Sequence, residues 1–443
     1  MPVGRFGDRV KDMRQKLLTR LGALLAAGAL MLGWASVPAQ AYSGSQAEAQ
    51  MDPSNDPYSF PNIQLCCKPK KKTYRPHKPW YPPGGPGPGP GAGGPVQYVS
   101  CGEPRPYTSS SIGEALDRLR NGGRIRVLPY GACDISGLSI DESVVIESAE
   151  EYGGRAELRG GSCATVAPGY GSSVVGFSDI DIDGCLVVQN GRLDFNRVNL
   201  SSRGAGDAVR LNGGSFSSTE STIRARGPAI NAVRGTMVSL TGGGFASGAR
   251  ADQVVALNVD GANVQNTLIK GGVIGVRVGM TGRYPVIFNR VQVSRGEASE
   301  IYQIGPGQAG IVVGGNGPGD DLPSLPSLPG VSFSIEGGVI AGYGDGLVFT
   351  PGSRGSAKGV TIAYPGRGIV VGAGAAVDLR ENRITHSKRT GIDLAAGASG
   401  QASFNDIQCD SGSCVCYGGD CTSRSDRDFG KGAFRMSGTR CDD

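Results

Sequence analysis

The sequence predicts an all-β fold, a solenoid of parallel coils known as a parallel β-helix, because short strand-like phrases recur at a fixed spacing. The aliphatic residue of one phrase recurs at intervals of 22, 22 and 23 residues, at Ile340, Ile362, Ile384 and Ile407. A second phrase, GLV, GIV or GID, follows at the same period from Gly346, Gly368 and Gly391. The chain is also rich in glycine, with 74 in 443 residues, and only 6% aromatic, which disfavours a helical bundle or a sandwich with large core side chains.

Residues 1–41 are expected to be a secretory signal peptide. Six basic residues precede the apolar run LGALLAAGALMLGWASVPAQA, which ends in Ala39-Gln40-Ala41. Cleavage before Tyr42 would change 44 basic and 39 acidic residues to 38 and 37, so the remaining chain is nearly neutral and gives no argument for nucleic acid. We expect an exported protein, periplasmic, on the cell surface or extracellular, with no transmembrane segment after cleavage.

Residues 42–95 are expected to be a disordered arm and linker. The stretch KPKKKTYRPHKPWYPP clusters basic and aromatic residues, and GGPGPGPGAGGP at 84–95 cannot form a core. Two interpretations remain open, a solvated spacer or electrostatic adhesion to an anionic envelope polymer or lipid surface. The adhesion hypothesis expects binding that weakens with salt and is lost when residues 64–82 are deleted.

The solenoid is expected over residues 96–408, opening with a capping helix. Ser111 and Glu114 have the spacing of a capping box, and Ile112, Leu116 and Leu119 would share one helical face. Asn121-Gly122-Gly123 should end this helix, and RIRVL should form the first strand. A helix in this position would cover the open end of the solenoid.

Five phrases alternate apolar and polar residues, as short strands with one buried face do. They are FSDIDI from Phe177, FNRVNL from Phe195, FNRVQV from Phe288, ENRITH from Glu381 and FNDIQC from Phe404. With coils of about 22 residues spaced about 4.8 Å apart, Arg124 to Cys409 should give about 11–12 coils and a length of roughly 55 Å.

The helix-then-strand opening, followed by phrases of the F-N-R-V and G-I-x-L types, resembles the pectin-lyase-like right-handed parallel β-helix superfamily. The resemblance covers about residues 105–410 and implies a right-handed solenoid. It implies little about activity, because that superfamily includes lyases, hydrolases, esterases, epimerases, spike proteins and adhesins.

Eleven cysteines in an exported chain predict disulfides and leave at least one cysteine without an internal partner. Cys163 and Cys185 are 22 residues apart, one coil, so we expect a bond between them with Cα atoms about 5 Å apart. A second bond is expected between Cys101 and Cys133. Cys66 or Cys67 is the candidate for an intermolecular disulfide, and the five cysteines within residues 409–443 predict a stapled C-terminal cap rather than a zinc site.

Two acidic motifs suggest chemistry that their contexts do not support. DIDIDG at 179–184 matches half of a calcium loop, but Asn190 stands where the bidentate acid is needed, so we assign no metal. Asp320-Asp321 supply the paired aspartates of a polygalacturonase-like site, yet no Gly-His-Gly or Arg-x-Lys accompanies them and their segment reads as a long inserted loop. No cofactor and no catalytic residue is assigned.

His386 is one of only two histidines in the chain. Counted from the asparagine of each phrase, it occupies the position of Leu200 and Val293, which predicts an inward or strand-end slot and a structural role. Stacked coils should nevertheless bring a patch together at one corner, consisting of Tyr343, Tyr364, Arg367, His386, Lys388 and Arg389. Tyrosine faces and basic groups suit acidic sugars, so these are the candidate substrate-binding residues.

Two functions are therefore expected as alternatives. One is a non-catalytic envelope or extracellular protein that binds or organises acidic polysaccharide. The other is a polysaccharide lyase or epimerase acting on uronate-containing glycans, or a glycoside hydrolase. A β-elimination needs only a base of tuned pKa and a group that neutralises the uronate carboxylate, so absent motifs do not decide between them.

Overall fold

The structure is a computed structural model that describes residues 94–168, 173–204, 206–232, 235–248, 255–279, 284–295, 308–314, 332–410, 414–422 and 426–442. The predicted signal peptide, nearly all of the predicted arm with Cys66 and Cys67, and the segment with Asp320 and Asp321 lie outside the described residues. The described residues are 58% strand and 4% helix and form a β-solenoid of about 11 turns, which confirms the predicted fold class.

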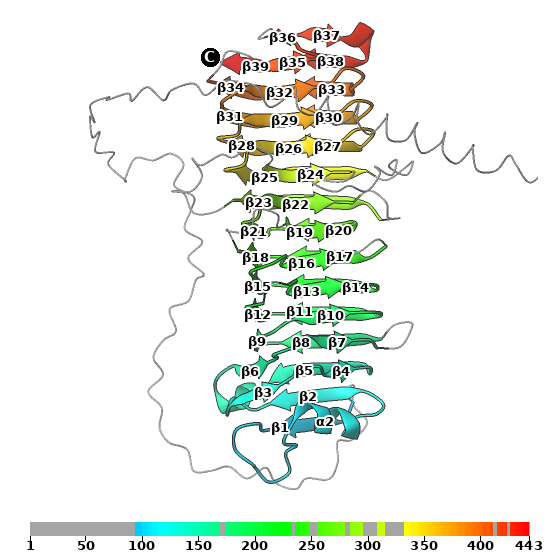
Figure 1. The fold of residues 1–443 in the computed structure, drawn as a ribbon, viewed down its shortest axis with the longest axis vertical. Helices are drawn as coiled ribbons and strands as arrows, with labels where there is room; N and C mark the ends of the chain where they lie inside the picture. The colour runs from blue at the N-terminus through cyan, green and yellow to red at the C-terminus, as the bar shows by residue number, and fades with distance from the viewer. Residues whose placement is uncertain are drawn as a thin grey trace, which may run out of the picture. The chain divides into compact units, whose positions relative to one another are not determined.

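The strands of successive coils pair, almost all in parallel, into two sheets, one of 26 strands and one of 13. The larger sheet folds along its length into two faces, here named A1 and A2, and the smaller is sheet B. Figure 1 shows the coils stacked in chain order from β1 at the blue end to the red end, where β36 and β37 lie beyond β35 and β38.

Face A1 consists of β1 (Val96–Val99), β2 (Gly123–Val127), β5 (Val144–Ser148), β8 (Val174–Ser178), β11 (Arg192–Asn196), β14 (Ser215–Thr219), β17 (Met237–Thr241), β20 (Gly261–Gln265), β27 (Arg354–Lys358), β30 (Ala376–Arg380), β33 (Ser399–Ser403), β37 (Arg427–Phe429) and β38 (Phe434–Ser437). Face A2 consists of β3 (Ala132–Asp134), β6 (Ala156–Arg159), β9 (Ile180–Asp183), β12 (Asn199–Ser202), β15 (Thr222–Ala225), β18 (Gly244–Ser247), β21 (Leu268–Lys270), β28 (Thr361–Ala363), β31 (Arg383–Ser387), β34 (Asp406–Cys409) and β39 (Arg440–Asp442). Two strands, β23 (Val286–Ser294) and β25 (Phe333–Ala341), run through both faces.

Sheet B consists of β4 (Ser139–Ile140), β7 (Ala164–Val166), β10 (Leu186–Val188), β13 (Val209–Leu211), β16 (Ile230–Ala232), β19 (Val255–Val259), β22 (Ile274–Val278), β24 (Ala309–Val313), β26 (Asp345–Phe349), β29 (Arg367–Val371), β32 (Thr390–Leu394), β35 (Val415–Tyr417) and β36 (Asp420–Thr422).

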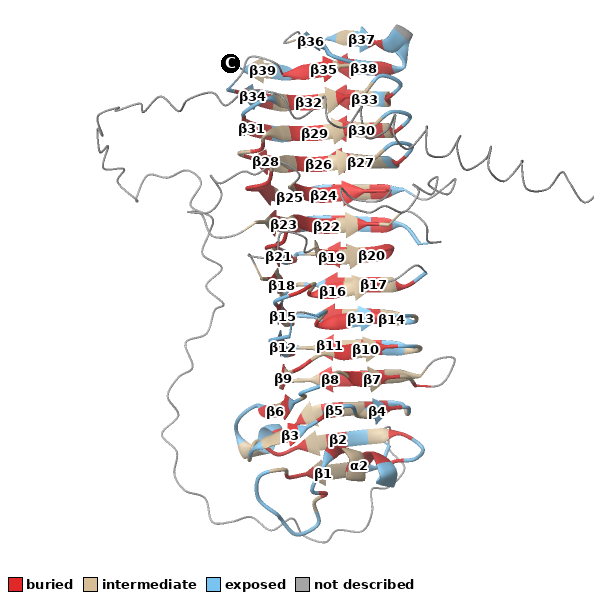
Figure 2. Ribbon diagram, viewed as in Figure 1, coloured by how far each residue is buried: buried red, intermediate tan, exposed pale blue. Residues whose placement is uncertain are grey.

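The core is a continuous column of inward-facing apolar side chains from all three faces, seen as buried positions along every coil in Figure 2. Phe177, Phe195 and Phe216 stack edge to face in successive coils, with ring centroids 5.8 and 5.1 Å apart. Ile340, Ile362, Ile384 and Ile407 pair directly as β25, β28, β31 and β34 stack, as the period predicts. Each coil thus buries the inner face of its neighbours.

A single residue in the left-handed conformation turns the chain from face A1 to face A2, and we name this position the tight corner. Arg197, with φ of 52°, and Glu381, with φ of 55°, are examples. The next residue is buried, and in three described coils a side chain from the following coil accepts a hydrogen bond from its backbone N–H. The Ser221 hydroxyl does so for Val198 at 3.0 Å. These contacts satisfy a donor that would otherwise be buried without a partner.

The glycine of the second phrase is required by close packing between sheet B and face A2. A Cβ on Gly368 would lie 2.4 Å from the Gly391 carbonyl oxygen and 2.7 Å from Cγ2 of Ile384. A Cβ on Gly391 would lie 2.2 Å from Cγ2 of Ile407. The two interleaved phrases therefore share a period, because an isoleucine side chain of face A2 packs against each glycine in the space that a Cβ would fill.

The N-terminal cap contains the expected helix, α2 (Ile112–Arg118), with Ser111 as its N-cap accepting from the Glu114 N–H at 3.1 Å. Ile112, Leu116 and Leu119 are buried beneath it, as predicted. The prediction that RIRVL is the first strand is wrong, because β1 precedes the helix and pairs in parallel with β2. Short β1 has one apolar residue facing the core, Val99, and so has little strand signal.

Both specified disulfides are present. Cys163 and Cys185 are bonded with Cα atoms 4.5 Å apart, close to the expected coil spacing, and Cys101 is bonded to Cys133 with Cα atoms 5.1 Å apart. A third bond joins Cys416 to Cys421 where β35 meets antiparallel β36. The solenoid is thus stapled near both ends.

The described part of the chain holds no helix that is long and apolar enough to cross a membrane.

Candidate functional site

Tyr343 does not lie on the surface, and its predicted place in the binding patch is wrong. Its side chain is 1% exposed, and its hydroxyl donates a hydrogen bond to the Gly271 carbonyl at 3.0 Å. Burial raises the pKa of Tyr343 well above its usual value. The left-handed residue of this coil is Gly342, with φ of 78°, so Tyr343 comes one position later and points into the core.

Tyr364 and His386 do meet at the surface, between face A2 and sheet B. Both adopt the left-handed conformation, with φ of 54° and 56°, and their rings stack with centroids 5.0 Å apart and planes 6° apart. His386 Nδ1 lies 3.6 Å from Asp410 Oδ1, and its side chain is 35% exposed. Together with Lys388 and Arg389 we name this site the aromatic corner.

Lys388 and Arg389 form the turn that follows His386 and are both exposed. Their backbone N–H groups bond to the carbonyls of Pro365 and Gly366 in the preceding coil, at 3.0 and 2.8 Å. This pairing fixes the two basic residues beside the stacked rings. The corner therefore presents a half-exposed aromatic stack flanked by positive charge, a combination suited to sugar carboxylates or sulfates.

Arg367 lies on the outer face of sheet B but is already occupied by protein carboxylates. Its Nε and Nη2 donate to both oxygens of Asp345 at 2.8 Å, and its Nη1 donates to Asp393 at 3.0 Å. The hydrogen bonds to Asp345 raise the pKa of Arg367 above its usual value. We therefore assign Arg367 to the ion-pair lattice between coils rather than to the aromatic corner.

The predicted alignment of His386 with Leu200 is wrong by two residues. Strand pairing aligns Leu200 through successive coils with Ile384, and not with His386. His386 is therefore at a strand end, as one part of the prediction had it, but it does not fill the inward slot of Leu200. It points outward because its left-handed backbone ends the alternation of β31.

The acidic motif DIDIDG is an arginine-binding element in this structure. Asp179 sits at the tight corner and forms a bidentate pair with Arg197 at 2.6 Å. On the outer side of β9, Asp181 pairs with Arg155 at 2.8 Å, and Asp183 lies 3.0 Å from Arg203. Three guanidinium groups thus neutralise the three carboxylates that a cation would need.

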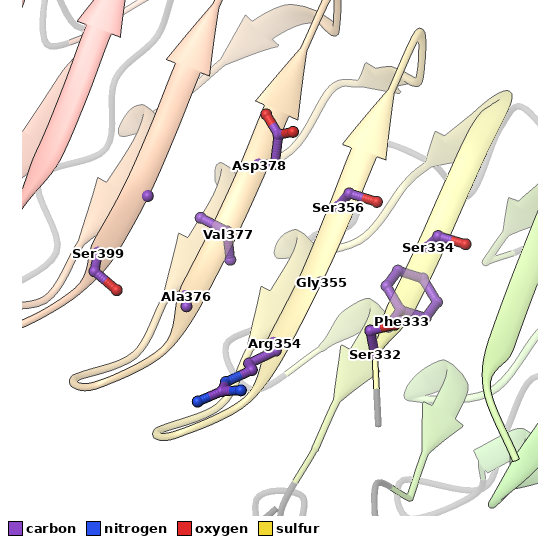
Figure 3. Close-up of a pocket in the computed structure, with 11 residues that line it drawn as sticks. Ser332, Phe333, Ser334, Arg354, Gly355, Ser356, Ala376, Val377, Asp378 and Ser399 are labelled. Atoms are coloured by element: carbon purple, nitrogen blue, oxygen red, sulfur yellow. The ribbon is translucent and has the colours of Figure 1, made fainter. Parts of the chain in front are cut away.

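A second surface feature was missed by sequence reasoning, a shallow depression of about 420 Å³ on the outer side of face A1. We name it the trough and define it by two rows of side chains crossing β25, β27, β30 and β33. One row is Ser334, Ser356 and Asp378, and the other is Ser332, Arg354, Ala376 and Ser399. Figure 3 shows both rows on neighbouring strands. Small polar residues at alternate strand positions were its only sequence signal.

No family model matches the chain, and no curated protein or solved structure matches it.

Proposed function

We propose that this is an exported envelope or extracellular β-helix protein that binds acidic polysaccharide through the aromatic corner. In this proposal it belongs with the pectin-lyase-like right-handed β-helices that its repeats resemble. The polymer partner is a uronate-containing or sulfated glycan, with sugar rings on Tyr364 and His386 and acidic groups beside Lys388 and Arg389.

The observation that carries the proposal is the pair of aromatic residues in left-handed conformation. Gly342 holds the equivalent position in the coil before, and glycine adopts this conformation without steric cost. For other residues the cost is about 1–2 kcal/mol each. Two adjacent coils thus contain a strained residue, and in both the strained residue places an aromatic ring on the surface. Strained backbone conformations of this kind cluster at binding sites, so we infer a binding function.

A lyase or epimerase remains the second candidate, favoured by one contact. The 3.6 Å approach of Asp410 to His386 Nδ1 places a carboxylate where it could orient an imidazole acting as a base. Lys388 or Arg389 would then neutralise the uronate carboxylate. Incubating the protein with polygalacturonate and following the ultraviolet absorbance of unsaturated products tests this activity directly.

Binding is tested with immobilised polygalacturonate, with dextran as the neutral control. Tyr364→Gly should weaken binding roughly five- to tenfold, since the ring that stacks on the sugar is lost, while glycine keeps the left-handed backbone conformation without strain. Phe404→Gly is the matched control, because Phe404 is 68% exposed and left-handed, with φ of 55°, but lies at the tight corner. Equal binding by wild type and Tyr364→Gly would refute the proposal.

A further inference from the structure

The trough runs parallel to the solenoid axis rather than across it. Strand pairing places Ser334 beside Ser356, Ser356 beside Asp378 and Arg354 beside Ala376. Each step along the trough therefore repeats at the strand spacing, about 4.8 Å. A ligand lying in it would meet one new pair of side chains at every coil.

The trough is shallow because the side chains that edge it are short. Ser332, Ser334 and Ser356 carry hydroxyls, and Ala376 carries a single methyl group. Small-molecule sites are usually concave clefts that enclose most of their ligand. An open trough that repeats from coil to coil instead suits an extended polymer, whose successive units can each use the same kind of contact.

Two exposed apolar side chains lie at the N-terminal end of the trough. Ile287 pairs with Ser334 and is 44% exposed on the outer side of β23. Tyr284 is 45% exposed, and its Cβ lies over outward-facing Gly261, where an added Cβ would approach to 2.7 Å. Because Gly261 has no side chain, the tyrosine ring can lie against face A1 beside the trough.

The two charged side chains of the trough differ in whether they already have partners in the protein. Asp378 accepts hydrogen bonds from Arg380 at 2.8 Å and from Gln401 at 3.1 Å. Arg354 is exposed, and among the described side chains none forms an ion pair with it. The trough therefore offers an uncommitted guanidinium, which binds carboxylate or sulfate in a bidentate manner.

We propose that the trough is a second binding site, which takes a linear acidic oligosaccharide lying along the solenoid axis. One sugar ring stacks on Tyr284, Arg354 binds an acidic group, and the serine hydroxyls bond to sugar hydroxyls. From the coil of Tyr284 to that of Ser399 is four steps, about 19 Å, so the site needs several linked sugars. This inference rests on the proposed function for its ligand class, but it uses a different face.

The experiment measures hexagalacturonate and galacturonate binding to the mature chain by calorimetry. Arg354→Ala should weaken hexagalacturonate binding about tenfold and Tyr284→Ala about fivefold, and galacturonate should bind too weakly to detect. Ser356→Trp should block the trough without changing charge. Lys358→Ala is the matched control on the same strand, because it removes the same charge outside the trough, and it should change binding less than about twofold.

The outcomes separate the two proposals. If Tyr364→Gly lowers hexagalacturonate affinity while Arg354→Ala and Ser356→Trp leave it unchanged, the trough proposal is overturned and the aromatic corner stands. If Lys358→Ala weakens binding as much as Arg354→Ala, the effect is one of general charge and the trough is again overturned. Failure of the wild type to bind hexagalacturonate overturns both.

Discussion

At the tight corner seven described coils place a residue other than glycine in the left-handed conformation, whereas between face A2 and sheet B two of the described coils do so. The seven are Asp179, Arg197, Glu220, Asn266, Arg290, Glu381 and Phe404. The two are Tyr364 and His386. The same backbone conformation thus occurs throughout one corner and only locally at the other.

The difference shows when an unusual backbone conformation points to function. At the tight corner one residue must turn the strand, and in three described coils a side chain of the next coil accepts from the buried N–H that follows, namely those of Val198, Val360 and Asn382. The conformation there belongs to the architecture. Glycine makes the turn in some coils of both corners, at Gly359 and at Gly342, but only Tyr364 and His386 among the described left-handed residues stack their rings on each other, which points to a role beyond the turn.

The largest expected effect tests the architectural role of the tight corner. Asn405 Oδ1 accepts from the backbone N–H and the side-chain amide of Asn382, both at 3.0 Å, and its own amide donates to the Leu379 carbonyl at 3.1 Å. Asn405→Leu would leave a buried N–H without an acceptor and should lower the free energy of unfolding by about 2–4 kcal/mol.

Asn405→Ser is the matched variant, because Ser221 performs the same task for Val198 in another coil. Chemical denaturation of both variants should show the serine variant as the milder one. Equal stability of the leucine variant and wild type would contradict the architectural role.

The next largest effect is expected for Arg367, and it tests whether the ion-pair lattice of sheet B is separate from the aromatic corner. Arg367→Ala would leave Asp345 and Asp393 without the guanidinium between them, and should lower the free energy of unfolding by about 1–3 kcal/mol. Lys388→Ala should change it by less than about 0.5 kcal/mol, as an exposed site does. Thermal unfolding measures both, and equal effects would argue against the separation of the two sites.

A smaller effect of opposite sign is expected for Tyr364. Tyr364→Gly relieves the left-handed strain but adds freedom to the unfolded chain, so stability should stay unchanged or rise by up to about 1 kcal/mol. Arg197→Gly at the tight corner should instead destabilise, since the pair with Asp179 is lost. A clear loss of stability in Tyr364→Gly would make that tyrosine part of the architecture as well.

The smallest effect concerns pH at the tight corner. Burial raises the pKa of Asp179, but hydrogen bonds from Arg197 and Ser178 outweigh it and leave the pKa below its ordinary value of 3.8. The stability from this pair is therefore present above pH 3.8 and is lost as the pH falls through the lowered pKa. The stability difference between wild type and Asp179→Asn should shrink on acidification, and a constant difference would contradict this.

Sequence alone predicted the period, the fold class and the Cys163–Cys185 bond, because each depends on the coil spacing. It also predicted the capping helix, from its capping box and apolar face, and the Cys101–Cys133 bond. It aligned the phrases wrongly. FNRVNL begins two positions earlier in the coil than ENRITH, since Val198 aligns with Asn382 and Leu200 with Ile384. A shift of two preserves the alternation of a strand, so the pattern alone could not reveal it.

The sites were harder to predict because they depend on which residue turns the corner. One position separates left-handed Tyr364, which faces outward, from a place such as that of Tyr343, which is buried. The trough had almost no signal, since serine and alanine on an outward face resemble any solvated strand. Its shape comes from four coils acting together.

The reversal of chain direction at the C-terminal end has a consequence for how copies of the molecule meet. There β36 and β37 run antiparallel to β35 and β38. A last coil of parallel strands would offer a template for the first coil of another copy, and such head-to-tail contacts do not close and so build fibres. With α2 packed against β1 and β2 at one end and reversed strands at the other, we expect head-to-tail stacking into filaments to be disfavoured.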